Sequence, residues 1–472
     1  MARRKKDIIL EKLLVEDYAA EGKSLARHEG KVIFIENVIP GDVVDVRLGK
    51  NKKDWAEGYP LRVHSYSRDR VEPFCQHFGV CGGCQWQMLP YEKQLFYKNR
   101  QVKDVLQRIG KVAMPEMMPI IGAKETRHYR NKIEYTFGNK RFLRKEELHD
   151  PNISSRQDVA GFHAKGMFDK IVDIQTCYLQ AEPTNAIRLA IKEFALRNKY
   201  TFYDIREHHG LLRTMQVRLC TTGELMVNIV FGEDDKKKRI ALLDHVLQLF
   251  PSITTLLYTI NLKKNDSLHD LEPIAYHGKG YVIEKLSTGE RDYHFKIGPK
   301  SFFQTNTLQG EQLYRITRDF AELSGNEIVY DLYCGTGSIG IFVSDKARKI
   351  VGVEMIAAAI EDAKENAALN NLASAEFYAG DVIDICTDEF FAAHGRPDVI
   401  ITDPPRAGMH EKLVNKILEI AAPTVVYVSC NPATQARDLG LLDAKYAVTK
   451  IQPVDMFPHT LHIENVVQLK LK

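Results

Sequence analysis

The chain has 472 residues, of which 44% are hydrophobic and 27% are charged. This is an ordinary globular composition, and a usual domain size of about 150 residues predicts roughly three domains. No apolar run approaches the ~20 residues that a membrane-spanning helix needs, so we expect no integral membrane protein. The basic start, Met1–Lys6, is followed by Asp7–Lys12, which has no apolar core. We therefore expect no secretion signal and a cytoplasmic location.

Charge is divided unevenly along the chain. Residues 1–320 hold 52 Lys and Arg against 41 Asp and Glu, whereas residues 321–472 hold 13 against 21. This asymmetry favours a basic part that faces a polyanion and an acidic part with another task. Scatter between solvated faces is the simpler alternative.

The first sixty residues contain two strand-like runs, 31–35 and 43–48, joined by the turn sequence Ile39–Asp42. A basic loop, 50–53, follows the second run. Short strands separated by Gly and Pro turns are typical of a compact β-barrel. We expect residues 1–63 to form a barrel of the oligonucleotide-binding type.

Eight cysteines are present, and three of them, Cys75, Cys81 and Cys84, fall within ten residues. In a reducing compartment such a cluster favours a metal site over disulfides. The next segment, Tyr91 to about Ile109, has a helical pattern that ends at Gly110. We expect a metal-binding loop followed by a helix that packs on the C-terminal part of the chain.

Beyond this helix the pattern changes twice. Residues 125 to about 290 are mixed α+β, with strand-like runs at 214–219 and 225–230. From about Asn326 onwards, strand and helix patterns alternate, which is the signature of a parallel sheet with helices on both faces. We expect a doubly wound, Rossmann-like sheet there. The strand patterns are 327–332, 399–402 and 425–429, and the helix patterns are 357–370 and 413–420.

A glycine-rich motif, DLYCGTGSIG at 331–340, follows the apolar strand Ile328–Val329. Glycines here allow a sharp turn and a close approach of the backbone to a ligand at a helix N-terminus. The spacing matches the dinucleotide fingerprint, with Glu354 at the position of its ribose-binding acid. A methyltransferase that binds S-adenosylmethionine has the same pattern, so the motif leaves a dehydrogenase and a methyltransferase open.

Three further motifs place reactive groups beside strands. Asp403 opens DPPR after one strand, where doubly wound sheets bind ligands. Cys430, in SCNPAT, follows the next strand, where a helix N-terminus would favour the thiolate. Glu464 lies between apolar runs, and partial burial would raise its pKa and suit it to proton transfer.

Together these motifs resemble those of the RNA uracil-5-methyltransferases that use S-adenosylmethionine. The order DLYCGTGSIG, VGVE, DPPR, SCNPAT and FPHTLHIE is similar to that family, and the likeness covers essentially the whole chain. Cys75-x5-Cys81-x2-Cys84 with the distant Cys177 resembles the iron-sulfur members, whose best-known type acts on 23S rRNA. The first sixty residues resemble the TRAM domain of that type. Ser338 departs from the Asn common there and is assigned no role.

The resemblance implies roles for individual residues. Cys430 corresponds to the nucleophile that adds to C6 of uracil, and Glu464 to the base that removes the C5 proton. The target base must leave its stack to reach the thiol. The residues that correspond to contacts with the methyl donor are Gln304, Tyr333, Glu354, Asp403 and, on the adenine side, Asp381. The ligands of a [4Fe-4S] cluster correspond to Cys75, Cys81, Cys84 and Cys177.

An RNA-facing surface is expected near the start of the central part. The segment 127–132 combines Arg127, Arg130 and Lys132 with Tyr129. Basic side chains of this kind contact phosphates, and aromatic rings stack on unpaired bases.

The expected fold is a multi-domain α/β chain. It comprises an OB-like TRAM barrel at 1–63, a central α+β domain with the iron-sulfur site at 64–290, and a Rossmann-like methyltransferase domain at 291–472. The expected activity is methylation of C5 of a uridine in 23S rRNA by a monomer without a membrane partner, and tRNA is the alternative substrate.

Two other classes of protein remain to be compared with this interpretation. A non-catalytic iron-sulfur RNA-binding protein would lack Cys430 or Glu464, and both are present. A dehydrogenase that binds NAD would leave SCNPAT, Glu464 and the four cysteines unexplained.

Overall fold

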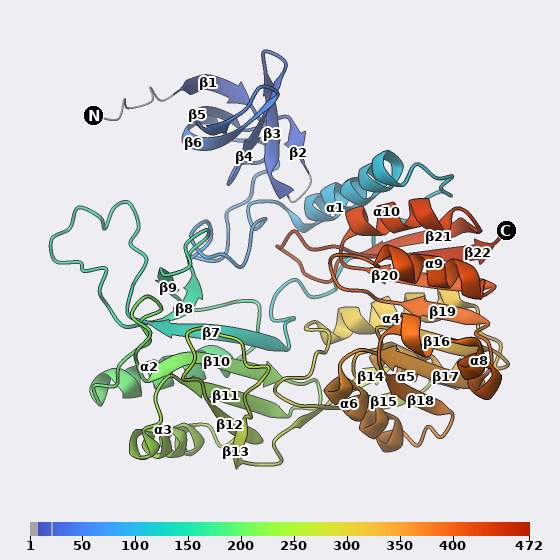
Figure 1. Ribbon diagram of the computed structural model, residues 1–472. Coiled ribbons are helices and arrows are strands. Elements are labelled where there is room, and N and C mark those ends of the chain that lie inside the picture. Colours follow the sequence, from blue (N-terminus) through green and yellow to red (C-terminus); the bar gives the residue numbers. More distant parts are fainter. Residues whose placement is uncertain (1–7, 20–21) are drawn as a thin grey trace.

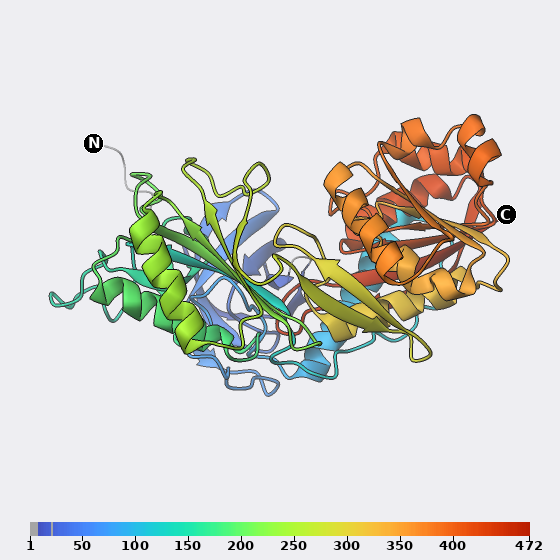
Figure 2. The same ribbon diagram turned by 90° about the horizontal axis from the view of Figure 1, so that it is seen from below.

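Figure 1 shows the computed structural model, which describes residues 8–19 and 22–472. The basic start Met1–Lys6 and part of the expected barrel lie outside the described residues. Three large sheets follow one another along the chain, and a two-stranded hairpin lies between the central and C-terminal sheets (Figure 2). No helix within the described ranges has the length and apolar character needed to cross a membrane.

The N-terminal sheet has six strands in the order β1-β5-β6-β4-β3-β2. Its bounds are β1 Ile9–Leu14, β2 Asp17–Tyr18, β3 Ser24–His28, β4 Lys31–Ile35, β5 Val43–Asn51 and β6 Trp55–Ser65. The two expected runs are β4 and most of β5. Alternate residues such as Ile33, Val44 and Val46 are fully buried in a small core. This period of two is what places one face of each strand inside.

A loop with the three clustered cysteines leads to α1 (Tyr91–Val105), which continues into a π-helical turn, η2 (Leu106–Gly110). The N-terminal sheet is attached to this loop, because the ring of Tyr18 lies 4.8 Å from that of Trp86. Trp86 is fully buried in a separate apolar cluster. The loop thus lies between the first sheet and the rest of the molecule.

The first helix packs on the C-terminal part. Its turn η2 approaches α10 (Pro432–Leu442) so closely that a Cβ on Gly440 would lie 3.2 Å from the carbonyl oxygen of Gly110. Val102 and Leu106 belong to the same apolar cluster as the inner side of α10. Two glycines at the contact allow the two backbones to approach each other.

The central sheet has seven strands in the order β13-β12-β11-β10-β7-β8-β9. Helices α2 (Thr184–Arg197) and α3 (Lys236–Leu249) contribute buried side chains to its core. The two expected runs are β10 and β11, each longer by one or two residues. The strand bounds are β7 Lys132–Gly138, β8 Val159–His163, β9 Ile171–Asp173, β10 Leu212–Leu219, β11 Leu225–Phe231, β12 Thr255–Ile260 and β13 Ile274–His277.

A hairpin of β14 (Val282–Ser287) and β15 (Asp292–Ile297) follows. The domain boundary expected at residue 290 falls in its turn. Val282, Tyr293 and Phe295 are buried in the core cluster that also contains one face of the C-terminal sheet. The hairpin therefore packs with the C-terminal part, and the compact unit begins before residue 291.

The C-terminal sheet has the order β18-β17-β16-β19-β20-β22-β21. Its first five strands are parallel and β22 runs antiparallel to β20. Alternate residues of one strand enter different cores: Val329 belongs to one cluster and Tyr330 to the other. Helices therefore cover both faces, as the alternating pattern predicted.

The elements of this part agree with the expected runs to within one or two residues. The strands are β16 Ile328–Leu332, β17 Lys349–Glu354, β18 Ala375–Ala379, β19 Val399–Thr402, β20 Thr424–Ser429, β21 Tyr446–Val454 and β22 Glu464–Leu471. The helices are α4 Thr307–Ala321, α5 Ser338–Val343, η3 Ser344–Lys346, α6 Ala357–Leu369, α7 Val382–Ile385, α8 Asp388–His394, α9 Glu411–Ile420 and α10.

Candidate active site and cysteine cavity

Strand register brings three predicted site residues to one edge of the C-terminal sheet. Leu332, the last residue of β16, pairs with Val353 of β17 and with Thr402 of β19. The carboxyl ends of parallel strands form the ligand-binding edge of a doubly wound sheet. The residues that follow these paired positions are Tyr333, Glu354 and Asp403.

The chain turns sharply between β16 and α5. Gly335 and Gly337 have left-handed backbones, with φ of +53° and +76°. A Cβ on Gly335 would meet no atom within 4 Å, whereas one on Gly337 would lie 2.9 Å from the ring of Phe377. The backbone nitrogen of Gly335 donates to Oε2 of Glu354 at 3.3 Å. The loop therefore leaves open space beside Glu354.

Asp331 supports this loop, although we assigned it no site role from the sequence. It is fully buried, and its Oδ2 accepts a hydrogen bond of 2.8 Å from the backbone nitrogen of Gly340. Burial raises the pKa of Asp331 to about 7, while the hydrogen bond acts in the opposite direction. An acid inside an otherwise apolar strand was the sequence signal for such a role, because buried carboxyl groups need partners.

Gln304 and Asp381 approach the same edge from other segments. Gln304 is buried just before α4, and its backbone oxygen accepts a hydrogen bond of 2.9 Å from Nδ2 of Asn131 in the central part. Asp381 lies two residues after Ala379, which pairs with Glu354. Its side chain caps the short helix α7. Four of the five residues expected to contact the methyl donor thus lie at the ends of strands at this edge or just after them, and the segment of Gln304 reaches the glycine-rich loop through a hydrogen bond of 3.5 Å from Oγ1 of Thr336 to the backbone oxygen of Phe302.

Cys430 and Glu464 lie at the ends of neighbouring antiparallel strands. Ser429 of β20 pairs with Asn465 of β22. Continuing this register by one residue sets Cys430 against Glu464, and directly opposed residues of antiparallel strands have Cα atoms about 4.5–5.5 Å apart. Segments that are distant in the sequence therefore bring the expected nucleophile and base together.

The expected lowering of the pKa of Cys430 is wrong. Burial, followed by the carboxyl groups of Glu464 and Asp403, raises the pKa of Cys430 to about 11, although Arg406 lowers it. The first turn of α10 is capped instead by the side chain of Asn431, which accepts a hydrogen bond from a backbone nitrogen. Burial and two neighbouring acids outweigh the helix N-terminus.

Two carboxyl groups beside the thiol have raised pKa values. Burial raises the pKa of Asp403 to about 7. Burial also raises the pKa of Glu464 well above its usual range, with Asp403 adding to the effect and Arg406 opposing it. The direction for Glu464 agrees with the expectation. Because two close buried carboxyl groups resist ionising together, this pair can hold a proton near neutral pH.

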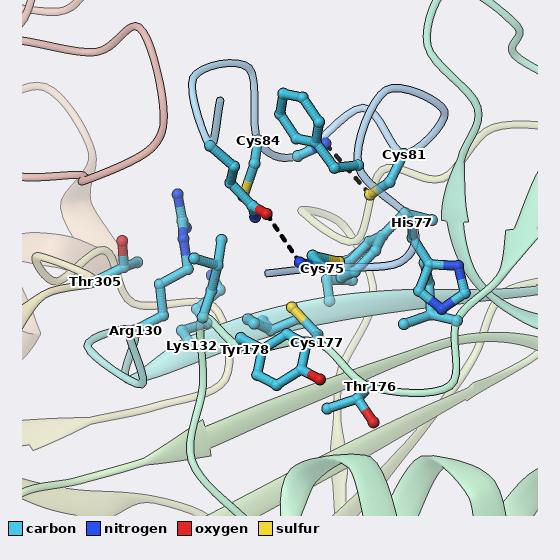
Figure 3. Close-up of a pocket in the computed structure, with 18 residues that line it drawn as sticks. Cys75, His77, Cys81, Cys84, Arg130, Lys132, Thr176, Cys177, Tyr178 and Thr305 are labelled. Atoms are coloured by element: carbon cyan, nitrogen blue, oxygen red, sulfur yellow. Dashed lines mark hydrogen bonds between the residues drawn. The ribbon is translucent and has the colours of Figure 1, made fainter. Parts of the chain in front are cut away.

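The four predicted cysteines line one cavity of about 380 Å³ (Figure 3). The sulfur atoms of Cys75, Cys81, Cys84 and Cys177 face the same space (Figure 3). Burial is the main cause of a raised pKa in each thiol, and neighbouring thiols raise those of Cys81 and Cys84 further. Arg130 also lines the cavity. The structure thus unites the clustered cysteines with Cys177 from a distant segment.

The thiols that line this cavity are not arranged as a single-ion site. Among residues 8–19 and 22–472, no three His, Cys, Asp or Glu side chains are close enough to hold one metal ion. One tetrahedral zinc, with Zn–S bonds of about 2.3 Å, would need sulfurs roughly 3.8 Å apart. The four thiols therefore surround a larger space than one ion fills.

The basic segment 127–132 is exposed only in part. Tyr129 is buried and its hydroxyl donates to the backbone oxygen of Pro458 at 3.0 Å, so the expected stacking of this ring on RNA is wrong. The guanidinium of Arg127 lies 3.9 Å from the ring centre of Phe74. That of Arg130 lies 5.0 Å from the ring centre of Phe457.

The strand order and the reversed β22 depart from the dinucleotide-binding fold of the dehydrogenases, a mostly parallel sheet of strand order 3-2-1-4-5-6. They define a Rossmann-like methyltransferase that uses S-adenosylmethionine. A family model described as tRNA (Uracil-5-)-methyltransferase matches residues 274–472. That match begins before residue 291, as the hairpin does.

Similar proteins cover nearly the whole chain. An "Uncharacterized RNA methyltransferase" of Bacteroides thetaiotaomicron is 50% identical, with 96% of this chain and all of the relative covered. Another, of Chlorobaculum tepidum, is 38% identical over 98% of this chain and 96% of its own. The crystal structure of Pyrococcus abyssi tRNA (uracil-54, C5)-methyltransferase with S-adenosyl-L-homocysteine is 28% identical, with a TM-score of 0.75 and coverage of 97% and 100%. The chain belongs to the RNA uracil-5-methyltransferase family.

Proposed function

We propose that the chain methylates C5 of a uridine in 23S rRNA, with Cys430 as nucleophile and Glu464 as base. The observation that carries this proposal is the strand register, which sets these two residues opposite each other beside Asp403. A thiol and a base at adjoining strand ends suit a reaction in which one adds to a pyrimidine ring and the other removes a proton from it. A non-catalytic RNA-binding protein has no need of this pair.

C5 of uracil is a poor nucleophile until the ring is activated. Addition of the Cys430 sulfur to C6 gives an enolate, whose C5 attacks the methyl group of S-adenosylmethionine and releases S-adenosylhomocysteine. C5 then carries both the methyl group and its original hydrogen. Glu464 takes that hydrogen as a proton, the C5–C6 double bond re-forms and the Cys430 sulfur leaves. Each residue acts on a different atom of the same ring.

The methyl donor is assigned to the carboxyl edge of the C-terminal sheet. Open space at Gly335 supports a close approach of the donor to the backbone. Glu354 and Asp381 suit its ribose and adenine, while Asp403 lies beside Cys430, where an acid attracts a sulfonium. Gln304 and Tyr333 complete the proposed set.

We further propose that Cys75, Cys81, Cys84 and Cys177 hold a [4Fe-4S] cluster. Four thiols around one cavity of about 380 Å³ fit this group, since each thiolate binds a separate iron of the cluster. One backbone amide already donates to a sulfur of the site: the nitrogen of Gly83 lies 3.4 Å from Sγ of Cys81. When bound, the cluster supplies a rigid link between the cysteine loop and the central sheet.

The RNA is proposed to cross the surface from the cysteine loop to Cys430. Arg127 stacked on Phe74 and Arg130 stacked on Phe457 lie along this route. Arg406 forms a hydrogen bond with His462 at its end. Guanidinium groups on aromatic rings bind phosphates and stack on unpaired bases.

tRNA is the second candidate substrate. The similarity to the Pyrococcus abyssi tRNA (uracil-54, C5)-methyltransferase covers 97% of this chain, so the same overall architecture supports tRNA as a substrate. Purified protein should be incubated with separate 23S rRNA and tRNA transcripts, and 5-methyluridine mapped in each. Product in tRNA alone would replace the rRNA proposal and leave the chemistry unchanged.

The chemistry itself is tested by two variants. Cys430→Ala should bind the methyl donor but form neither adduct nor product. Glu464→Gln should add to the ring and transfer the methyl group, then stall as a methylated RNA bound to Cys430, visible as a slow band in a denaturing gel. Glu419→Gln, on the exposed face of α9, is the control. Normal turnover of Glu464→Gln would contradict the assignment of the base.

A further inference from the structure

The segment Asp455–Ile463, here called the base segment, connects β21 to β22 and leads directly into Glu464. Its start and its middle are both held by the N-terminal half of the chain. These contacts lie outside the carboxyl edge and are not explained by binding of the methyl donor or RNA.

The first anchor is a buried ion pair. Nζ of Lys98, in α1, lies 2.7 Å from Oδ1 of Asp455, and both side chains are fully buried. Oδ2 of Asp455 accepts a hydrogen bond of 2.8 Å from the hydroxyl of Tyr91. Nζ of Lys98 also donates to the backbone oxygen of Phe457 at 3.2 Å. Because isolated buried charges are costly, this pair strongly disfavours any other position of the segment.

The second anchor surrounds His459. Oε1 of Gln94, also in α1, accepts a hydrogen bond of 2.9 Å from the backbone nitrogen of His459, and its Nε2 lies 3.1 Å from Nδ1 of the ring. The backbone oxygen of His459 accepts hydrogen bonds from the nitrogens of Gln85 and Trp86, at 2.9 and 3.1 Å. Gln85 directly follows Cys84. The cysteine loop is therefore bonded to the base segment.

The backbone of His459 shows that these contacts impose a conformation. Its φ is +65°, a left-handed value that costs free energy in a residue with a side chain. Such a conformation persists where the surrounding contacts determine it, and here the backbone nitrogen and oxygen and the ring are all engaged. The conformation of His459 is thus fixed by contacts from outside the base segment, in addition to hydrogen bonds within it such as that from Oγ1 of Thr460 to the backbone oxygen of Phe457.

We propose that Lys98 and Gln94 are positioning residues that orient Glu464 through the base segment, and that the cysteine loop shares this role through its bonds to His459. The inference rests on the proposed function of Glu464. If the anchors set the position of the base, their loss should slow removal of the C5 proton and spare the earlier steps, which depend on Cys430 and the methyl donor.

The test compares Gln94→Leu and Asp455→Asn with wild type in single-turnover reactions on the RNA substrate. We expect methyl transfer at nearly the wild-type rate and release of product slowed on the order of 10- to 100-fold, as a small displacement of a reacting group produces. Methylated RNA bound to Cys430 should accumulate in both variants. A merely unstable variant would instead lose adduct and product together.

The matched control is Asp204→Asn. Asp204 is also buried and paired with a lysine, Lys140, at 2.8 Å, but it lies in the central part. Circular dichroism and binding of S-adenosylhomocysteine establish that each variant is folded. Gln94→Glu keeps the acceptor for the backbone nitrogen of His459 but loses the Nε2 donor to the His459 ring and to the backbone oxygens of Trp86 and Leu89. It is the second variant if Gln94→Leu does not fold, and methylated RNA bound to Cys430 should accumulate in it as well.

The two proposals fail in different ways. Absence of methylated adduct in Glu464→Gln would refute the assignment of the base, and with it this inference. Accumulation in Glu464→Gln, together with wild-type release in the folded anchor variants, would overturn the positioning role alone.

Discussion

Arg406 and His462 are hydrogen-bonded to each other beside the thiol of Cys430. Burial, with Arg406 and other cations nearby, lowers the pKa of His462 to about 4, so this ring is neutral at physiological pH and accepts from the guanidinium. The neutral ring adds no charge of its own, so the positive charge beside the nucleophile comes from the guanidinium of Arg406. Its charge opposes the effect of burial and of the two acids on the thiol.

The first prediction concerns pH. Only the thiolate attacks C6, and the pKa of Cys430 is raised to about 11, so the fraction of reactive sulfur grows as pH rises. The rate of adduct formation should increase about tenfold per pH unit between about pH 6 and about pH 9. Arg406→Gln removes a group that lowers this pKa and should move the profile to higher pH. Rapid-quench measurement of adduct formation with saturating RNA checks the pH dependence of the wild type and its shift in Arg406→Gln. A rate that does not change with pH would mean that the thiolate is already formed when substrate is bound.

The second prediction uses two glycines with nearly the same backbone. Gly337 and Gly166 have φ of +76° and +74°. A Cβ on Gly337 would lie 2.9 Å from Phe377, whereas one on Gly166 would meet no atom within 4 Å. Gly166→Ala should lower the free energy of unfolding by about 1–2 kcal/mol, which is the cost of a left-handed backbone in a residue with a side chain. Gly337→Ala should be destabilised more and should bind S-adenosylhomocysteine more weakly, as thermal unfolding and calorimetry would show. Equal losses in the two variants would refute a special role of this loop.

The third prediction concerns RNA. Each phosphate contact removed should lower the slope of binding against salt by about one. Arg127→Ala and Arg130→Ala should therefore weaken RNA binding and flatten its salt dependence, and leave binding of S-adenosylhomocysteine unchanged. Arg197→Ala, at an exposed ion pair on α2, is the control. Filter binding at several salt concentrations measures this, and unchanged slopes would place the RNA elsewhere.

The fourth prediction concerns the cysteine cavity. Protein purified without oxygen should be brown and contain iron and acid-labile sulfide. Cys81→Ser should lose the colour and most of the iron. Cys386→Ala removes a cysteine that is buried outside the cavity and should retain both. Stoichiometric zinc without iron in the wild type would exclude the cluster.

Local patterns in the sequence predicted much of the C-terminal fold. The strand Val399–Thr402 and the strand that ends before Cys430 were recognisable because buried parallel strands form short apolar runs between turns. The antiparallel strand β22, which begins at Glu464, was not among the expected runs. The meeting of Cys430 with Glu464 required one further step, the family resemblance, since no local pattern contains the pairing of β20 with β22.

Other properties depend on long-range packing and were not predictable. The pKa of Cys430 is raised because segments far along the chain bury it and supply Glu464 and Asp403. Tyr129 faces inward because its hydroxyl finds the backbone of Pro458. The hairpin at residue 290 packs with the C-terminal core through side chains such as Tyr293, whose burial no sequence pattern there indicated.

The packing of the first helix has a consequence for the autonomy of the catalytic domain. One end of this helix, η2, lies against α10, which begins just beyond Cys430, and its other turns hold the base segment ahead of Glu464. The segments that carry Cys430 and Glu464 therefore both pack against the same helix, which belongs to the N-terminal half of the chain. A fragment that begins at residue 291 contains the whole doubly wound sheet but lacks the helix that contacts the segments of Cys430 and Glu464.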